Sequence, residues 1–211
     1  MQIATDDFNR ANALGAGLGL GPAWTLVFGG PWATNGFGIS SNTAVPDSFG
    51  SDKLSIYTRV NFPNDQYAQC RVTVTGTASD TGFGVALRSS LDGANLYRCV
   101  VNKAGTNNVV IAKAVANAYT ALQRYTVTWT DGDMFRVEIA GTTLTAYQNG
   151  VALSPTVSDA SMASGYPGLV LSSAVTSGSC DDWEAGDFSL QNIMPRRLTK
   201  KVVTAGFAGP F

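Results

Sequence analysis

Residues 124–153 contain three short stretches in which apolar and polar side chains alternate, separated by tight-turn signals. In the first stretch Tyr125, Val127 and Trp129 fall on one face and threonines fall on the other. Alternation with a period of two residues, interrupted by Asp-Gly and Asn-Gly pairs, is typical of antiparallel strands joined by hairpins. The pattern therefore predicts an antiparallel sheet and excludes a helical fold for this part of the chain.

The same rhythm continues through most of the 211 residues, without sustained helical periodicity and without a fixed-length repeat. We therefore predict an all-β fold, an antiparallel β-sandwich, as one domain over residues 1–189. Residues 115–122 are predicted to form either one helical turn or a loop. The predicted strands lie near residues 24–28, 36–40, 53–60, 66–76, 82–89, 95–103, 108–114, 124–130, 134–140, 143–148, 168–173 and 181–189.

The composition removes several classes of enzyme. The chain contains no histidine, which excludes the Ser/His/Asp triad, the Cys/His dyad and any zinc site that uses histidine. Charged residues make up only 14% of the chain, well below the usual quarter. The surface must therefore rely on uncharged polar side chains, which are common in extracellular and particle-forming β proteins.

The three cysteines, Cys70, Cys99 and Cys180, lie within or beside predicted strands. They are interpreted as small buried hydrophobic residues, while a bridge between Cys70 and Cys99 stays open. No apolar run approaches the ~18 residues of a membrane span, and the first residues do not resemble a signal peptide. We therefore expect a protein made in the cytoplasm, with no membrane partner.

The last 22 residues differ from the body. Residues 1–195 hold 10 basic and 15 acidic side chains, a net charge of −5, whereas residues 196–211 hold four basic ones, so that the total is −1. We predict that residues 190–211 form a basic and apolar arm, either solvated or docked on a partner. Nucleic-acid binding is disfavoured, because four charges on an acidic protein give weak contact. The partner-binding residues of the arm would be Arg196, Arg197, Lys200, Lys201, Val202, Val203, Phe207 and Phe211.

Five segments form an ordered set: Asp6-Asp7-Phe8-Asn9-Arg10-Ala11 with Trp24, Asp65-Gln66-Tyr67-Ala68-Gln69 with Val72-Thr73-Val74, Gly82-Phe83-Gly84-Val85-Ala86-Leu87-Arg88 with Tyr97-Arg98-Cys99-Val100, Leu144-Thr145-Ala146-Tyr147-Gln148-Asn149-Gly150, and Gly165-Tyr166-Pro167-Gly168-Leu169 with Asp181-Asp182-Trp183. The set resembles the concanavalin A-like (LamG-type) jelly-roll superfamily over about residues 5–189. The resemblance implies a closing strand that pairs beside the first strand. The superfamily includes carbohydrate-binding modules, lectins, glycoside hydrolases and phage virion proteins, so the fold alone does not choose a function.

The entry segment, in a chain close to single-domain length, resembles structural proteins of tailed phages. The leading prediction is therefore a non-enzymatic component of a larger assembly, such as a head decoration or tail protein of a phage virion. Its partners would be other protein subunits, either copies of itself or other virion proteins, held through the arm. The alternatives are a carbohydrate-binding module or lectin that binds a cell-surface glycan, and a glycoside hydrolase-like enzyme.

The acidic residues give little support to catalysis. A glycosidase needs two carboxylates facing one cleft, and the retaining glucanases of the superfamily carry an E-x-D-x-x-E strand. Here Glu138 and Glu184 are the only glutamates and neither fits that pattern. Calcium is the one cofactor that the pattern allows, because calcium prefers clustered oxygen ligands. Its ligands would come from Asp6, Asp7, Asp181 and Asp182, which otherwise cap turns.

Sugar binding would require an exposed aromatic ring beside polar groups. The candidates are Trp32, Tyr67, Tyr97 and Tyr147, with Arg88 and Arg98 as polar neighbours. Trp24, Trp129 and Trp183 are predicted to lie in the core instead, because a sandwich of this size must bury aromatic rings between its sheets.

Overall fold

The computed structural model describes residues 3–14, 19–27, 30–32, 36–75, 82–104, 106 and 108–187, and these residues form strands and connecting loops without a helix. Among them, no helix is long and apolar enough to cross a membrane. The arm predicted at 190–211 lies outside the described residues. The strands are Ile3–Asp6 (β1), Trp24–Val27 (β2), Phe37–Ser40 (β3), Thr43–Pro46 (β4), Lys53–Tyr57 (β5), Gln66–Thr75 (β6), Phe83–Ser89 (β7), Leu96–Val101 (β8), Val109–Val115 (β9), Ala118–Tyr125 (β10), Asp133–Ala140 (β11), Thr143–Gln148 (β12), Val151–Ala152 (β13), Val157–Ser158 (β14), Tyr166–Leu171 (β15) and Ser177–Asp187 (β16).

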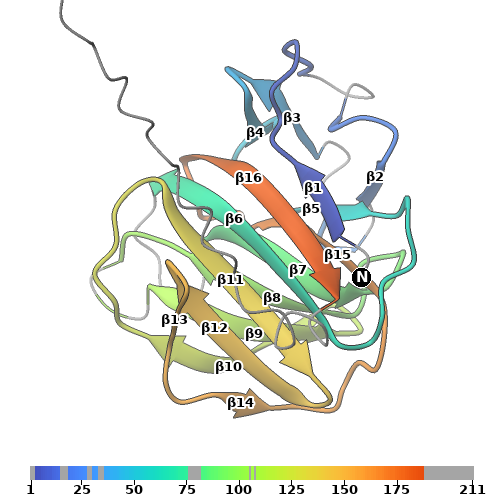
Figure 1. The fold of residues 1–211 in the computed structure, drawn as a ribbon. Coiled ribbons are helices and arrows are strands. Elements are labelled where there is room, and N and C mark those ends of the chain that lie inside the picture. Colours follow the sequence, from blue (N-terminus) through green and yellow to red (C-terminus); the bar gives the residue numbers. More distant parts are fainter. Residues whose placement is uncertain are drawn as a thin grey trace, which may run out of the picture.

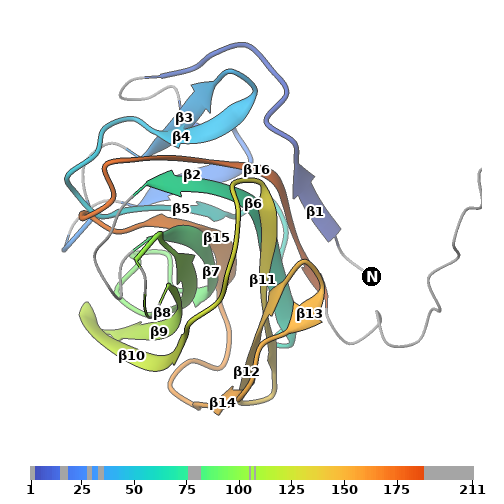
Figure 2. The ribbon, with the colours of Figure 1, turned by 90° about the vertical axis from the view of Figure 1, so that its left-hand side faces the viewer.

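The strands build two antiparallel sheets that face each other, so the all-β sandwich prediction is confirmed (Figure 1). The nine-stranded sheet runs β13-β12-β11-β6-β16-β4-β3, with β1 added to β16 and β14 added to β12. The seven-stranded sheet runs β10-β9-β8-β7-β15-β5-β2. Figure 2 shows the seven-stranded sheet curving through β7 to β10 opposite β6, β11 and β12.

The core lies between the sheets because alternate side chains of each strand point inward. Phe135, Val137 and Ile139 of β11 are buried there, as the alternation predicted. Trp24 and Trp183 are also in this core, with ring centroids 4.6 Å apart. Burial of each large apolar side chain contributes roughly 1.5–3 kcal/mol, so this layer provides most of the driving force for folding.

A second apolar cluster covers the outer face of the seven-stranded sheet. Its members include Trp32, Leu54, Ile56 and Val100. The strands β7 and β8 are consequently buried on both faces. This explains why their sequences are nearly continuous in apolar residues rather than alternating.

Residues 115–122 form neither a helical turn nor an open loop. They contain the turn and first half of the β9–β10 hairpin, in which Ala118 pairs with Val115. Ala116 and Asn117 both have positive φ, 49° and 66°, as a two-residue hairpin turn of this hand requires. The sequence analysis missed the hairpin because alanine is a poor indicator of positive φ.

The strand predicted at 124–130 ends at Tyr125. Val127 and Trp129 still pack against the core from an irregular segment. The side chain of Asn108 replaces a neighbouring strand here, because its Nδ2 donates to the Val127 carbonyl at 2.6 Å and its Oδ1 accepts from the Val127 amide at 2.9 Å. Apolar and polar side chains therefore continue to alternate beyond Tyr125, although the backbone there no longer belongs to the sheet.

The first and last strands pair, as the resemblance implied. In β1 and β16, Asp6 lies opposite Trp183 and Thr5 lies opposite Glu184. The strand β16 also pairs with β6, with a bulge between Asp181 and Glu184 where Asp182 takes a positive φ of 49°. The bulge redirects the side chains at this position, next to the site described below.

The three cysteines are buried and free, so the bridge between Cys70 and Cys99 is not formed. All three belong to the core between the sheets. Their interpretation as small buried hydrophobic residues is confirmed.

Candidate functional site

The outer face of the nine-stranded sheet carries a group of polar side chains at its centre. Because Cys70, Val72 and Phe135 point into the core, the residues that alternate with them on β6 and β11 must point outward. The register places Gln69 of β6 between Arg136 of β11 and Glu184 of β16. We define the polar cluster as Tyr67, Gln69, Arg136, Glu138, Tyr147 and Glu184.

Arg136 organises one half of the polar cluster. Its Nε donates to Glu138 Oε1 at 2.6 Å, and its Nη2 lies 2.5 Å from the same oxygen. Its Nη1 donates to Gln69 Oε1 at 3.4 Å. The guanidinium carbon lies 3.6 Å from the centroid of the Tyr67 ring, a stacking arrangement that holds the guanidinium plane over the sheet.

Each glutamate of the polar cluster accepts a hydrogen bond from a tyrosine. Tyr147 donates to Glu138 Oε2 at 2.8 Å, and Tyr67 donates to Glu184 Oε1. Burial raises the pKa of Tyr147 to about 12, helped by its bond to Glu138. Burial and the bond to Glu184 raise the pKa of Tyr67 as well. Both phenols therefore stay protonated and act as donors across the physiological pH range.

A hollow of about 420 Å³ opens beside the polar cluster. Gln69 and Glu184 belong to both features, so the hollow and the cluster form one continuous site. Its position follows from the pairing of β1, β16, β6 and β11, which brings together residues more than a hundred positions apart. The hollow is lined by Thr5, Asp6, Asp7, Gln69, Met134, Asp182, Trp183 and Glu184.

The acids proposed for calcium line or border this hollow but already have protein partners. Asp6 accepts from the Phe8 amide, from Arg10 at 2.6 and 2.9 Å and from Trp24 Nε1 at 2.9 Å. Asp182 is paired with Arg71 at 2.8 Å. Among the described residues, no three acids or thiols gather in a way that could hold a metal ion.

The other two acids have turn-capping roles. Asp7 accepts from the amide of Asn9, and Asp181 accepts from the amide of Asp182. Burial raises the pKa of Asp181, outweighing the hydrogen bond from the Asp182 amide. The geometry matches the alternative reading of these acids as turn caps, while calcium binding itself stays a prediction.

Most of the residues predicted to contact a glycan lie away from the polar cluster. Trp32, at 4% exposure, packs against the ring of Tyr119 on the seven-stranded sheet. Tyr97 is fully buried and donates to Asp159 at 2.7 Å. Of the predicted aromatic residues, Tyr67 and Tyr147 lie in the polar cluster, and Tyr67 is buried there beneath Arg136.

Arg88 is structural in the same way. It is 3% exposed, and its guanidinium donates to the carbonyls of Asn64, Met162 and Gly141 at 2.8 to 2.9 Å. Arg88, Tyr97 and Trp32 therefore present no exposed surface on which a sugar ring could stack. The expectation of an aromatic platform at these positions is corrected by their burial.

Sequence reasoning missed most of the polar cluster. The sequence analysis names Tyr67 and Tyr147 among the candidate sugar-binding aromatic residues, but it does not single out Gln69, Arg136 or Glu138 as part of a site. The sequence does show that the residues of the polar cluster occupy the polar positions of strands in which polar and apolar residues alternate. Ordinary surface residues occupy the same positions, so the alternation does not distinguish a binding site from a solvated face.

The two glutamates do not lie on adjacent strands. Their strands β11 and β16 are separated by β6, and the register offsets them by two residues. Strand spacing and rise then separate the two Cα atoms by about 12 Å. Arg136 and Tyr67 stand between them and bind one carboxylate each.

No protein-family model matches the chain, and no curated protein matches it. Solved structures do match. A carbohydrate-binding module, CBM66 from Bacillus subtilis, superimposes with a TM-score of 0.62 at 16% identity, covering 77% of this chain and 94% of the module. The VIP36 exoplasmic/lumenal domain in a Ca²⁺/mannose-bound form has a TM-score of 0.55 at 11% identity. The match covers 82% of this chain and 86% of that domain.

Glycoside hydrolases are also among the similar structures. The GH43 protein BlXynB from Bacillus licheniformis has a TM-score of 0.61 at 12% identity, with 87% of this chain covered. This chain spans only 39% of that enzyme. At these identities the likeness shows the fold: the chain has a concanavalin A-like, jelly-roll sandwich of the kind found in binding modules, lectins and parts of hydrolases.

Proposed function

We propose that the protein is a non-enzymatic carbohydrate-binding domain that holds a glycan on the outer face of its nine-stranded sheet. The observation that carries this proposal is the polar cluster beside the 420 Å³ hollow. Sugar hydroxyls both donate and accept hydrogen bonds, and planar amide, carboxylate and guanidinium groups match pairs of them. Gln69, Arg136 and Glu184 supply these three groups side by side.

The folds of the similar structures support a carbohydrate-binding domain better than a structural component of a larger assembly. CBM66 and VIP36 are a carbohydrate-binding module and a mannose-bound domain by their descriptions. The virion role predicted from the sequence stays a prediction, and the structures reported above lend it no support. The alternative reading, a carbohydrate-binding module or lectin, is therefore the one that we adopt.

A panel of immobilised polysaccharides and oligosaccharides, followed by isothermal titration calorimetry, tests the proposal. Gln69→Ala should weaken the affinity for the selected glycan about tenfold, the loss of one or two hydrogen bonds. Thr73→Ala is the matched control, because Thr73 is exposed on the same strand and the same face. Binding that is equal in both variants, or no binding to any member of the panel, would contradict the proposal.

The non-enzymatic part of the proposal has its own test. Incubation with xylan, β-glucan and the selected glycan should release no reducing ends, because the two glutamates are separated by Arg136 and Tyr67. Turnover that disappears in Glu184→Gln or Glu138→Gln would show that the site is catalytic. Turnover that survives both substitutions would point to a contaminating enzyme.

A further inference from the structure

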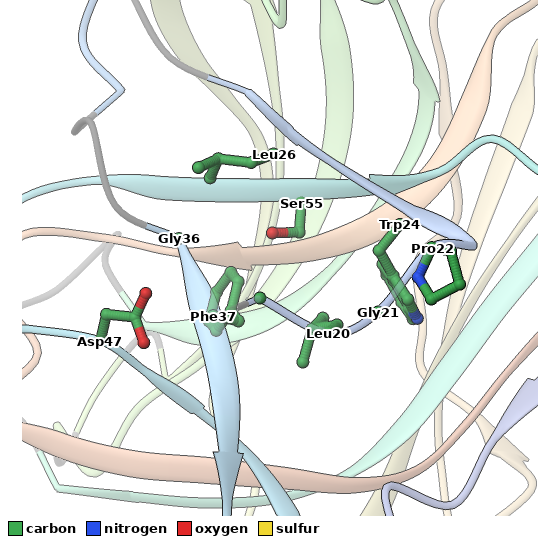
Figure 3. A pocket seen from close by; sticks show the side chains of 10 residues that line it. Leu20, Gly21, Pro22, Trp24, Leu26, Gly36, Phe37, Asp47 and Ser55 are labelled. Atoms are coloured by element: carbon green, nitrogen blue, oxygen red, sulfur yellow. The ribbon is translucent and has the colours of Figure 1, made fainter. Parts of the chain in front are cut away.

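A second recess lies between the two sheets, where β3 of one sheet faces β2 and β5 of the other. Its volume is about 410 Å³. Figure 3 shows the side chains that surround it. The lining residues among those described are Gly19, Leu20, Gly21, Pro22, Trp24, Leu26, Gly36, Phe37, Asp47 and Ser55.

Most of the wall is apolar. Leu20, Trp24 and Phe37 are buried members of the core, and Leu26 projects into the same space. Gly36 allows the chain to come close to β2 and β5, because a Cβ there would come within 2.3 Å of Leu26 Cδ1 and 3.0 Å of Ser55 Oγ. The recess thus extends from the apolar core toward the surface.

Ser55 places one polar group inside this wall. The residue is 3% exposed, and its hydroxyl points into the recess (Figure 3). This hydroxyl is not among the buried polar atoms of the described residues that lack a partner, and it lines the recess, where solvent reaches it. A ligand that carries a hydroxyl group can exchange a hydrogen bond with it in place of water.

The charge around the recess limits the ligand. Asp47 contributes a carboxylate to the wall, which disfavours an anionic ligand. Asp47 also interacts with the charge of Lys53: burial lowers the pKa of Lys53, and the carboxylate of Asp47 opposes that shift. Asp47 is itself engaged within the protein, so it does not call for a cationic ligand.

We propose that the recess binds a small, uncharged, mainly apolar molecule that carries one hydroxyl group, such as a phenol or a cyclic alcohol. An apolar cavity of ~150 Å³ is enough to bind benzene in another protein, so 410 Å³ admits one or two rings. Ser55 would exchange a hydrogen bond with the ligand hydroxyl, while Trp24 and Phe37 would contact its ring. This site is separate from the glycan site, although Trp24 donates from its Nε1 to Asp6 in the neighbouring hollow at 2.9 Å.

Nuclear magnetic resonance titrations of the full chain with phenol, benzene and benzoate test this site. Phenol should shift the amide signals of β2, β3 and β5 and bind about five- to tenfold more tightly than benzene, the ratio expected for one hydrogen bond. Benzoate should bind more weakly than either. Ser55→Ala should bring the phenol-to-benzene ratio close to one and leave benzene binding unchanged.

Variants that fill the recess provide a second, independent test. Leu26→Phe or Leu26→Trp should abolish binding of both phenol and benzene, with thermal melting used to confirm that each variant folds. Val151→Ser, an exposed position on β13, is the control and should bind as the parent does. Gln69→Ala should also leave phenol binding unchanged, so failure of this site and failure of the glycan site are distinguishable.

The proposal is wrong if saturating phenol leaves the signals of β2, β3 and β5 unmoved. It is equally wrong if the folded Leu26 variants bind phenol as the parent does, or if Ser55→Ala retains the preference for phenol over benzene.

Discussion

At the scale of single residues, several polar groups are buried because they replace backbone partners. Arg88 is the strongest example, since it donates to three carbonyls from three separate loops. The sequence presents Arg88 as a candidate sugar ligand because sugar sites combine aromatic rings with polar neighbours. Nothing local in the sequence shows that loops at 64, 141 and 162 would converge on it, so its role became visible only in three dimensions.

Arg88→Ala should lower the free energy of unfolding by about 2–4 kcal/mol, because three carbonyls would lose their donor in a buried place. Urea denaturation monitored by tryptophan fluorescence measures this. Arg59→Ala, at an exposed position, should change stability by less than about 0.5 kcal/mol. Equal effects of the two substitutions would refute the structural role of Arg88.

The environment of Asp159 predicts how the free energy of unfolding depends on pH. Burial alone would raise its pKa, but hydrogen bonds from Lys113, Ser161 and Tyr97 together outweigh burial and lower the pKa. A carboxylate whose pKa is lower in the folded state stabilises the fold above its unfolded pKa of about 4, and that stability is lost as the pH falls further.

Asp159→Asn should therefore lower the free energy of unfolding by about 2 kcal/mol at pH 7, and the difference from the parent should shrink below pH 4. Denaturation curves between pH 2 and 7 measure it. A difference that is independent of pH would show that the charge of Asp159 does not matter.

At the scale of elements, turn chemistry explains both the successes and the errors of sequence reasoning. The Asn149-Gly150 turn was recognised from its residues, and both have positive φ, 50° and 82°. The β9–β10 turn uses Ala116-Asn117, and alanine carries no such signal. Residues 126–130 alternate as a strand would, yet the backbone groups of Val127, Thr128 and Thr130 bond to side chains, which alternation cannot reveal.

Ala116→Gly should raise the free energy of unfolding by about 0.5–1 kcal/mol, because glycine adopts positive φ without the steric cost that alanine bears. Ala118→Gly, two residues along in β10, should have the opposite sign, since glycine weakens a strand. Thermal melting of the two variants decides the matter. A decrease in stability for Ala116→Gly would contradict the turn geometry.

At the scale of the whole molecule, the sheets could be predicted but the site could not. Alternation and turns are local, so the sandwich follows from them. The hollow needs Thr5, Gln69 and Glu184 to meet through the register of β1, β6 and β16, and register is set by long-range packing. The pairing of the ends was anticipated from a family resemblance, which supplied the topology, and from the Asp-Asp-aromatic segments near both ends of the chain.

The assembly role remains testable at this scale. Both sheets are built from residues 3–187, so deletion of residues 190–211 should leave far-UV circular dichroism and cooperative melting intact. If the arm anchors the protein to a partner, truncation should abolish incorporation into the assembly, measured by native mass spectrometry and co-sedimentation. Normal incorporation of the truncated chain would show that the arm is not needed to anchor the protein.

The three buried thiols of the core can report how often the folded molecule opens. Burial raises the pKa of Cys99 to about 12 and raises that of Cys180 strongly, so the folded protein holds almost no reactive thiolate there. A water-soluble alkylating reagent can modify these sulfurs only when the two layers separate. The rate of modification, followed by mass, therefore reports how often the sandwich opens in its native buffer. Such a measurement needs no denaturant.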